Sequence, residues 1–409
     1  MKCRHCKASL EFNFLDLGFS PPSNGYLSEE DLNRHETYYP LRVNVCHKCW
    51  LVQTEDYIEP DIFFNPSYTY LSSTSKTWLD HAANYSQMVI QRFDLNETNF
   101  VVEIASNDGY LLKNFTDKKI PCLGIEPASN AAAISENLGI PVINEFFGNS
   151  LANELRRKNK LADLIIGNNV YAHVPDINDF TKGLKVLLKP EGVITLEFPH
   201  ILNLMDKNQF DTIYHEHYSY LSLNTVKNIF ESEGLKIWDV EFLSTHGGSL
   251  RIYAGHTKNS RNVSERVLEL LAKETDRGLQ RLQSYRAFQM HADRIKNELL
   301  IFLIDKKKSG KVVVAYGAAA KGNTLLNYAG VKPDLLAYVC DAALSKQGKY
   351  MPGSHIPIFA PEILRIKRPD YILILPWNLS SEIRHQLKDM ADHGVKFVTA
   401  VPELKIYEA

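Results

Sequence analysis

The stretch Thr212–Tyr220, TIYHEHYSY, concentrates side chains that can move protons: two histidines, one glutamate and three tyrosines within nine residues. Histidine titrates near neutral pH, and a neighbouring tyrosine or glutamate can orient the imidazole or share its work. A core helix or strand does not use its positions in this way. A polar loop or a hydrogen-bonded helix start explains the same composition, so the interpretation depends on the segments around the stretch.

Two strand–turn–helix patterns with glycine in the turn flank this stretch, one at Val101–Leu112 and one at Val312–Asn323. In open α/β sheets, ligands bind at the carboxyl ends of the strands, where such turns lie. The sequence therefore predicts that the stretch at 212–220 serves two bound molecules.

The upstream turn departs from the dinucleotide fingerprint. Ala105 and Asn107 replace its first two glycines, and only Gly109 remains. Phosphate needs a very close approach to the backbone, so the turn favours an adenosyl ligand without phosphates. Glu126 closes the next strand, CLGIEPA, about where an acid accepts hydrogen bonds from ribose hydroxyls. A purely structural acid at a strand end is the alternative.

The rest of the central region alternates strands with helices. Glu103 can bind an ammonium group or stabilise a polar turn, and the Phe146 ring can pack against an adenine ring. A fourth strand at 162–167 ends in Asn168 and Asn169, and KIWDVEFL and SLRIYAG read as a final hairpin. The pattern predicts a mostly parallel, doubly wound sheet with one reversed edge strand.

The downstream turn carries features of an anion site. Gly317 and Gly322 flank three alanines, and Lys321 lies where the helix begins. Free N–H groups at a helix start favour an anion, and lysine adds a positive charge. A diphosphate fits this turn better than the upstream one, although a tight βα turn without a ligand is the alternative. A following strand, LLAYVCD, ends with Asp341, which predicts a second, smaller α/β domain behind a helical region at 260–308.

Two CxxC pairs lie near the N-terminus, Cys3 with Cys6 and Cys46 with Cys49. This spacing lets four thiolates converge on one tetrahedral zinc ion. A closed four-cysteine site leaves no position for water, so we expect it to stabilise a small domain and not to catalyse. Disulfides are the alternative, but they are uncommon in cytoplasmic chains.

Composition sets the broad class. The 409 residues exceed one typical domain, and 44% hydrophobic with 23% charged residues is usual for a globular protein. A net charge of −2 gives no field that recruits nucleic acid or an anionic membrane. The chain begins with charged residues and a cysteine pair instead of an apolar signal, and no apolar run of about 18 residues is present. We expect a cytoplasmic monomer.

Four motifs, VVEIASNDG, GIEPA, IIGNNVYAHVPD and LLKPEGVITLEFP, resemble those of the class I methyltransferases that use S-adenosylmethionine. With the CxxC pairs, YHEHYSY and YGAAAKGN, the whole chain resembles the nucleotide-sugar C-methyltransferases. The resemblance implies a zinc-binding domain at 1–75 and a Rossmann-like methyltransferase domain at 76–257. It implies a helical linker with a nucleotide-sugar-binding α/β domain at 258–409.

The resemblance also implies an activity: methyl transfer from S-adenosylmethionine to a ring carbon, C3, of a nucleotide-linked 4-keto-6-deoxysugar, through an enolate, in deoxysugar biosynthesis. By the family motif, His217 is the base, Tyr214 stabilises the enolate, and Glu216 orients an imidazole or grips a sugar hydroxyl. His215 is the competing base. An O- or N-methyltransferase of a small metabolite, or a non-catalytic nucleotide-sugar-binding protein, are the alternatives.

The remaining predicted contacts fall into three sets. The acceptor substrate is expected to touch Tyr68, His173, Arg251, Lys321, Asn323 and Asp341. The methyl donor is expected to touch Glu103, Ala105, Ser106, Asn107, Gly109, Glu126, Pro127, Phe146, Asn168 and Asn169. A structural Zn²⁺ is expected on Cys3, Cys6, Cys46 and Cys49. For Arg251, pairing with an acid is the alternative to binding phosphate.

Overall fold

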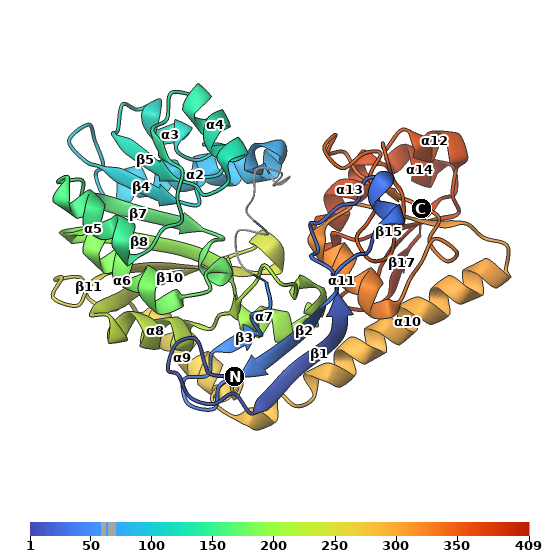
Figure 1. The fold of residues 1–409 in the computed structure, drawn as a ribbon, viewed down its shortest axis with the longest axis horizontal. Helices are drawn as coiled ribbons and strands as arrows, with labels where there is room; N and C mark the ends of the chain where they lie inside the picture. The colour runs from blue at the N-terminus through green and yellow to red at the C-terminus, as the bar shows by residue number, and fades with distance from the viewer. Residues whose placement is uncertain (59–62, 64–70, 409) are drawn as a thin grey trace.

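A computed structural model of the chain describes residues 1–58, 63 and 71–408. Three sheets succeed one another, and the small N-terminal sheet lies beside both larger α/β units (Figure 1). No helix within the described residues is long and apolar enough to cross a bilayer.

The N-terminal sheet is antiparallel and takes one strand from far along the chain. Its strands are β1 (Phe12–Ser20), β2 (Tyr39–Val45), β3 (Val52–Thr54) and β9 (Ser219–Tyr220), in that spatial order. Strand β9 is the end of the TIYHEHYSY stretch, with Val52 opposite Tyr220. The histidine-rich stretch is therefore attached to the cysteine-bearing part of the chain.

The central sheet has the order β10-β11-β8-β7-β4-β5-β6. Its strands are β4 (Val101–Ile104), β5 (Cys122–Ile125), β6 (Val142–Ile143), β7 (Ala162–Asn168), β8 (Leu188–Pro199), β10 (Leu235–Leu243) and β11 (Ser249–His256). The predicted doubly wound fold and final hairpin are confirmed. The predicted place of the reversed strand is wrong: β11 pairs antiparallel with both β8 and β10, so it lies inside the sheet and β10 forms the edge.

Helices cover both faces of this sheet (Figure 1). They are α2 (Lys76–Arg92), α3 (Lys113–Thr116), α4 (Ser129–Asn137), α5 (Asn149–Arg157), α6 (Ile177–Leu187) and α8 (Leu223–Ser232). The short helix α7 (Ile201–Asp206) packs instead in the core that the N-terminal sheet shares with the C-terminal unit. Helix α2 begins where the Ser75 side chain accepts a hydrogen bond from the Trp78 N–H, which is the usual N-cap arrangement. Its buried face carries Trp78, Ala82, Tyr85 and Val89, which recur at the three- and four-residue spacing of an amphipathic helix.

The C-terminal sheet, in the order β14-β13-β12-β15-β16-β17, is parallel except for β17. Its strands are β12 (Val313–Tyr316), β13 (Val339–Cys340), β14 (Ile358–Phe359), β15 (Tyr371–Ile374), β16 (Lys396–Thr399) and β17 (Lys405–Tyr407). Its helices are α11 (Ala320–Ala329), α12 (Ile363–Lys367), α13 (Ser380–Gln386) and α14 (Lys388–Asp392).

Two helices connect the central and C-terminal units, α9 (Glu265–Asp276) and the long α10 (Phe288–Lys308). Helix α10 runs along one side of the molecule, from the N-terminal sheet to the C-terminal unit (Figure 1). Phe288 at its start stacks on Phe14 of β1, with ring centroids 4.8 Å apart. The N-terminal sheet thus shares one apolar core with α10 and the C-terminal unit.

Candidate active site

A cavity of about 480 Å³ lies where the three parts of the chain meet. Its lining includes the upstream turn (Ala105, Asn107), the catalytic candidates (Tyr214, Glu216, His217) and the start of α11 (Lys321). Asn24, from the N-terminal part, lines it as well. One space therefore borders both predicted nucleotide turns and the stretch between them.

The upstream turn is held in an unusual backbone conformation. Ala105, Asn107 and Gly109 all have positive φ angles, of 56°, 50° and 78°. A side chain at Gly109 would come within 2.7 Å of both Ile140 and Ser135, so only glycine fits there. The Glu126 carboxylate braces the turn, because its two oxygens accept the N–H groups of Asn107 and Ala128, each at 2.8 Å.

His217 presents one ring nitrogen to the cavity and anchors the other. Its Nδ1 lies 2.8 Å from the Thr212 carbonyl oxygen, which can only accept, so the ring proton resides on Nδ1. The Nε2 lone pair is left for a proton from outside. The Tyr214 ring packs 4.0 Å from the imidazole, and the His173 ring lies 4.6 Å away. Burial, followed by the charge of His173, holds the pKa of His217 well below its ordinary value, so the imidazole is neutral at pH 7.

The neighbouring His215 points elsewhere. Its Nε2 lies 3.2 Å from the Pro40 carbonyl oxygen and its ring packs edge-on against Tyr39. It does not line the cavity. Of the two candidate bases, the structure brings only His217 to the space that a substrate can enter.

Glu216 forms part of the cavity wall, and only 3% of the residue is exposed. Both of its oxygens accept hydrogen bonds from the Asn24 side-chain amide, at 2.8 and 3.0 Å. Burial raises the pKa of Glu216 to about 7, and the Asn24 amide opposes that shift. This carboxyl group therefore changes its charge close to neutral pH.

The C-terminal wall carries two lysines. Lys321, in the first turn of α11, donates to the Asn378 side-chain oxygen at 2.7 Å and lies 4.8 Å from the Trp377 ring centre. Lys346 lines the same wall, donates to the Ala318 carbonyl oxygen at 2.8 Å and lies 3.7 Å from an Asp341 carboxylate oxygen, which offsets part of its charge. Burial lowers the pKa of both amines. Two cations beside a helix start give this wall the character of an anion site.

The four cysteines form a compact cluster away from the cavity. Their Sγ atoms all lie within 4.8 Å of one another, and the pairs Cys3–Cys49 and Cys6–Cys46 are 3.5 Å apart. Four thiolates at about 2.3 Å from a zinc ion would lie about 3.8 Å from one another, so the cluster fits a tetrahedral ion.

The comparisons with known proteins agree with these features. Family models match a zinc binding domain at residues 3–64, a methyltransferase domain at 79–240 and a C-methyltransferase C-terminal domain at 244–402. The C-methyltransferase NovU of Streptomyces niveus is 34% identical over 408 residues, which is 100% of this chain and 97% of that protein. The chain belongs to the C-methyltransferase family. It is an S-adenosylmethionine-dependent enzyme, as the sequence predicts.

Solved structures resemble the enzyme over less of its length. Magnesium protoporphyrin IX methyltransferase from Synechocystis PCC 6803 with bound SAH aligns with a TM-score of 0.35 and 13% identity, over 43% of this chain and 82% of that one. The PH0226 protein from Pyrococcus horikoshii OT3 aligns with a TM-score of 0.38 and 12% identity, over 46% of this chain and 95% of that one.

The cavity wall fits a methyl donor with a polar adenosyl group. Among the described residues, both side-chain polar atoms of Asn168 are buried at the wall without a hydrogen-bond partner, and a bound ligand can supply one. Of the predicted donor contacts, the wall includes Ala105, Asn107, Glu126, Pro127, Phe146, Asn168 and Asn169. Glu103, Ser106 and Gly109 lie behind the wall, and burial raises the pKa of Glu103 well above its usual range.

Three predicted acceptor contacts lie outside the cavity wall and bind other parts of the enzyme. Asn323 donates to the Ser23 carbonyl oxygen at 2.7 Å. Asp341 accepts the N–H groups of Ala318 and Ala343, so it braces the second turn as Glu126 braces the first. His173 and Lys321 do line the wall, and Tyr68 lies outside the described residues.

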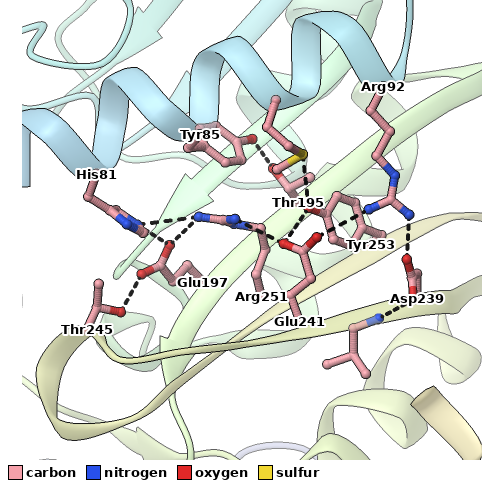
Figure 2. A network of polar contacts seen from close by, with 12 residues as sticks. His81, Tyr85, Arg92, Thr195, Glu197, Asp239, Glu241, Thr245, Arg251 and Tyr253 are labelled. Atoms are coloured by element: carbon pink, nitrogen blue, oxygen red, sulfur yellow. Dashed lines mark hydrogen bonds and ion pairs between the residues drawn. The ribbon is translucent and has the colours of Figure 1, made fainter.

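Arg251 is the third predicted acceptor contact that lies outside the cavity wall. It pairs with acidic side chains, which is the alternative to binding phosphate. Its guanidinium donates to Glu197 and to Glu241, each at 3.1 Å, within a chain of buried polar groups beneath α2 (Figure 2). A guanidinium engaged with two carboxylates is not available to a phosphate. Glu241 lies opposite Arg251 across the predicted hairpin, whereas Glu197 lies opposite it on β8, 54 positions away, and the sequence does not predict that second partner.

Several cavity residues are missing from the sequence-based prediction: Asn24, Trp78, His246 and Lys346. The signal for Lys346 is the Gly/Pro-rich loop that it begins, KQGKYMPGSHIP, because such a loop between two strands can border a pocket. His246 lies in THGG, which the sequence presents only as a hairpin turn. For Asn24 and Trp78, no local pattern separates a wall residue from a packed one.

Proposed function

We propose that the enzyme methylates C3 of a nucleotide-linked 4-keto-6-deoxysugar, in deoxysugar biosynthesis. The observation that carries this proposal is the placement of a neutral imidazole, His217, with its Nε2 open to the cavity between the adenosyl turn and the two lysines. Carbon methylation needs a carbon nucleophile, and a ketone supplies one by acidifying the hydrogen on the neighbouring carbon. A neutral imidazole carries a free lone pair at neutral pH and can accept that proton.

Each part of the wall has a role in this reaction. His217 takes the C3 proton on Nε2, while Thr212 holds its Nδ1 proton and so fixes the ring. The electrons of the C–H bond move into the carbonyl group and form an enolate. Bound S-adenosylmethionine supplies a methyl group on a positively charged sulfur, which the enolate carbon accepts as the carbon–sulfur bond breaks. The Tyr214 hydroxyl is the predicted donor to the enolate oxygen.

The C-terminal wall suits the other end of the acceptor. Lys321 and Lys346 offer two positive charges, and the free N–H groups at the start of α11 face the same space. A diphosphate matches this set of donors. We expect Glu216, held by Asn24, to orient the acceptor through a sugar hydroxyl.

The test uses a panel of nucleotide-linked 4-keto-6-deoxysugars incubated with the enzyme and S-adenosylmethionine. Mass spectrometry should show one added methyl group, and NMR should place it on the carbon next to the ketone. Methylation on oxygen or nitrogen, or no turnover with any member of the panel, would contradict the proposal.

The base is tested by His217→Asn, which should abolish solvent-deuterium exchange at C3 together with turnover. His215→Asn is the matched control, because it replaces the adjacent histidine outside the cavity and should retain exchange. If His217→Asn exchanges at the rate of the unmodified enzyme, His217 is not the base.

A further inference from the structure

The loop between β10 and β11, residues 245–248, brings a third histidine to the cavity. His246 lines the wall with a left-handed backbone, at φ 51°, and Gly247 and Gly248 follow at 89° and 126°. A side chain on Gly247 would come within 2.6 Å of Trp377, and one on Gly248 within 2.5 Å of Asn203. A non-glycine residue in this region is costly, and it persists where the surroundings hold it firmly.

The surroundings do hold it, from both sides. Thr245, at the start of the loop, donates its hydroxyl hydrogen to Glu197 at 2.8 Å. Glu197 is 0% exposed and also binds Arg251 at 3.1 Å and His81 at 2.9 Å (Figure 2). From the other side, the Gly247 carbonyl oxygen accepts from the Gln209 amide at 2.9 Å. The buried network of Figure 2 therefore ends at the residue before His246 and fixes its position.

The orientation of the imidazole follows from its neighbours. The side-chain amide nitrogen of Asn169 lies 2.5 Å from His246 Nε2, so Nε2 accepts and the ring proton lies on Nδ1. The Trp78 ring packs edge-on against the imidazole at 5.1 Å. Burial lowers the pKa of His246 to about 4, so the ring is neutral at pH 7. Nδ1 has no hydrogen-bond partner in the part of the chain that the structure describes.

His217 and His246 thus present opposite functions to one cavity. His217 keeps its proton at the Thr212 carbonyl and offers a lone pair, whereas His246 keeps its lone pair at Asn169 and offers an N–H. Because the lone pair of His246 is occupied by the Asn169 amide, its free Nδ1–H acts as a hydrogen-bond donor and the ring does not act as a base. The two rings are close enough that charge on His246 lowers the pKa of His217.

We propose that His246 Nδ1–H donates a hydrogen bond to the ketone oxygen of the acceptor substrate. This role rests on the proposed function, and it adds a second donor beside Tyr214. As His217 removes the carbon-bound proton, the electron pair of that bond moves toward the carbonyl oxygen. His246 stabilises the negative charge there without losing its own proton. A neutral donor that is already in place at the oxygen strengthens as the charge develops.

The experiment measures enolate formation apart from methyl transfer. The enzyme is saturated with S-adenosylhomocysteine, given the panel sugar that the unmodified enzyme methylates, and followed by NMR in D₂O for exchange of the hydrogen next to the ketone. The test variant is His246→Gly, because glycine tolerates the left-handed backbone and carries no side-chain donor. His385→Gln, on the exposed face of α13, is the control.

We expect His246→Gly to slow exchange about 10²-fold, the usual effect of removing one such donor. The affinity for S-adenosylmethionine, measured by calorimetry, should fall by much less, because His246 meets the predicted donor site only through Asn169. Thr245→Val keeps the shape of the side chain but removes its bond to Glu197, and should slow exchange about tenfold by loosening the loop. Exchange at the unmodified rate in His246→Gly, or a loss of donor affinity as large as the loss of exchange, would overturn the assignment.

A second measurement needs no acceptor. In enzyme labelled with ¹⁵N in histidine, the signals that vanish in His246→Gly should belong to a neutral ring protonated at Nδ1 at pH 7. An Nε2-protonated or charged ring would overturn the proposal. If the unmodified enzyme neither exchanges nor methylates any panel sugar, the proposed function is wrong. The ketone oxygen is then also wrong as the group that accepts the hydrogen bond from His246. The ¹⁵N result still decides whether His246 is a donor.

Discussion

Replacing Asn24 by alanine tests how the N-terminal part of the chain acts on the cavity. Asn24 supplies the only hydrogen bonds that the described residues give to the Glu216 carboxylate, at 2.8 and 3.0 Å. Glu216 is 3% exposed, and burial already raises its pKa to about 7. Without the amide, the charged form loses its stabilising partner, so the pKa should rise further.

The size of that rise follows from the energy of the bond. A hydrogen bond to a charged group contributes about 1.5–3 kcal/mol, and one pKa unit corresponds to about 1.4 kcal/mol. Removing Asn24 should therefore raise the pKa of Glu216 by about one unit or more. Between the ordinary glutamate pKa and its raised value, the folded enzyme holds a proton that the unfolded chain has lost. Stability therefore falls as pH rises through that window, and the variant extends the window upward.

The assay is chemical denaturation at about pH 6 and about pH 9. At the lower pH, Glu216 is largely protonated in both proteins, and Asn24→Ala should cost little. At the higher pH the carboxylate is charged, and the variant should lose about 1.5 kcal/mol more. In a Glu216→Gln background this pH-dependent difference should vanish. An equal cost at both pH values would refute the coupling between Asn24 and Glu216.

Three further predictions follow from the described contacts. Cys46→Ser should reduce bound zinc from about one equivalent to near zero by elemental analysis, and it should lower the melting temperature. Glu126→Ala should weaken S-adenosylmethionine binding at least about tenfold by calorimetry, because it removes the brace of the upstream turn; unchanged affinity would contradict this role. Arg251→Met should lower the free energy of unfolding by about 3 kcal/mol, since Glu197 loses its buried partner, whereas a substrate contact would show as a raised acceptor KM at full stability.

The sequence predicts what depends on neighbouring residues. The CxxC spacing brings thiolates together within one knuckle, and the apolar run before Ala105 is long enough for one buried strand. The acid after each second strand, Glu126 or Asp341, is predicted at the ligand. Glu126 lines the cavity and Asp341 does not, but both acids brace their turns by accepting backbone N–H groups.

What the sequence does not predict depends on contacts between distant segments. Asn24 meets Glu216 across 192 positions, and Arg251 meets Glu197 across 54. The tautomer of His246 depends on Asn169, 77 positions away. The spacing of residues within one segment does not predict such pairs, because each pair forms only when the fold brings distant segments together. For the same reason the reversed strand β11 was expected at the edge, whereas it lies between β8 and β10.

The four-cysteine cluster lies away from the cavity, yet strand pairing connects it to His217. Strand β3 follows directly after Cys49 and pairs with β9, with Gln53 opposite Ser219. Next to that pair, the Thr54 hydroxyl donates to the His217 carbonyl oxygen at 3.2 Å, and the Gln53 amide donates to Cys3 Sγ at 3.3 Å. A shift of the cysteine knuckle therefore moves the strand that positions His217. Because proton transfer depends steeply on the placement of the proposed base, we expect removal of the zinc by a chelator to lower turnover, although the cysteine cluster does not line the cavity.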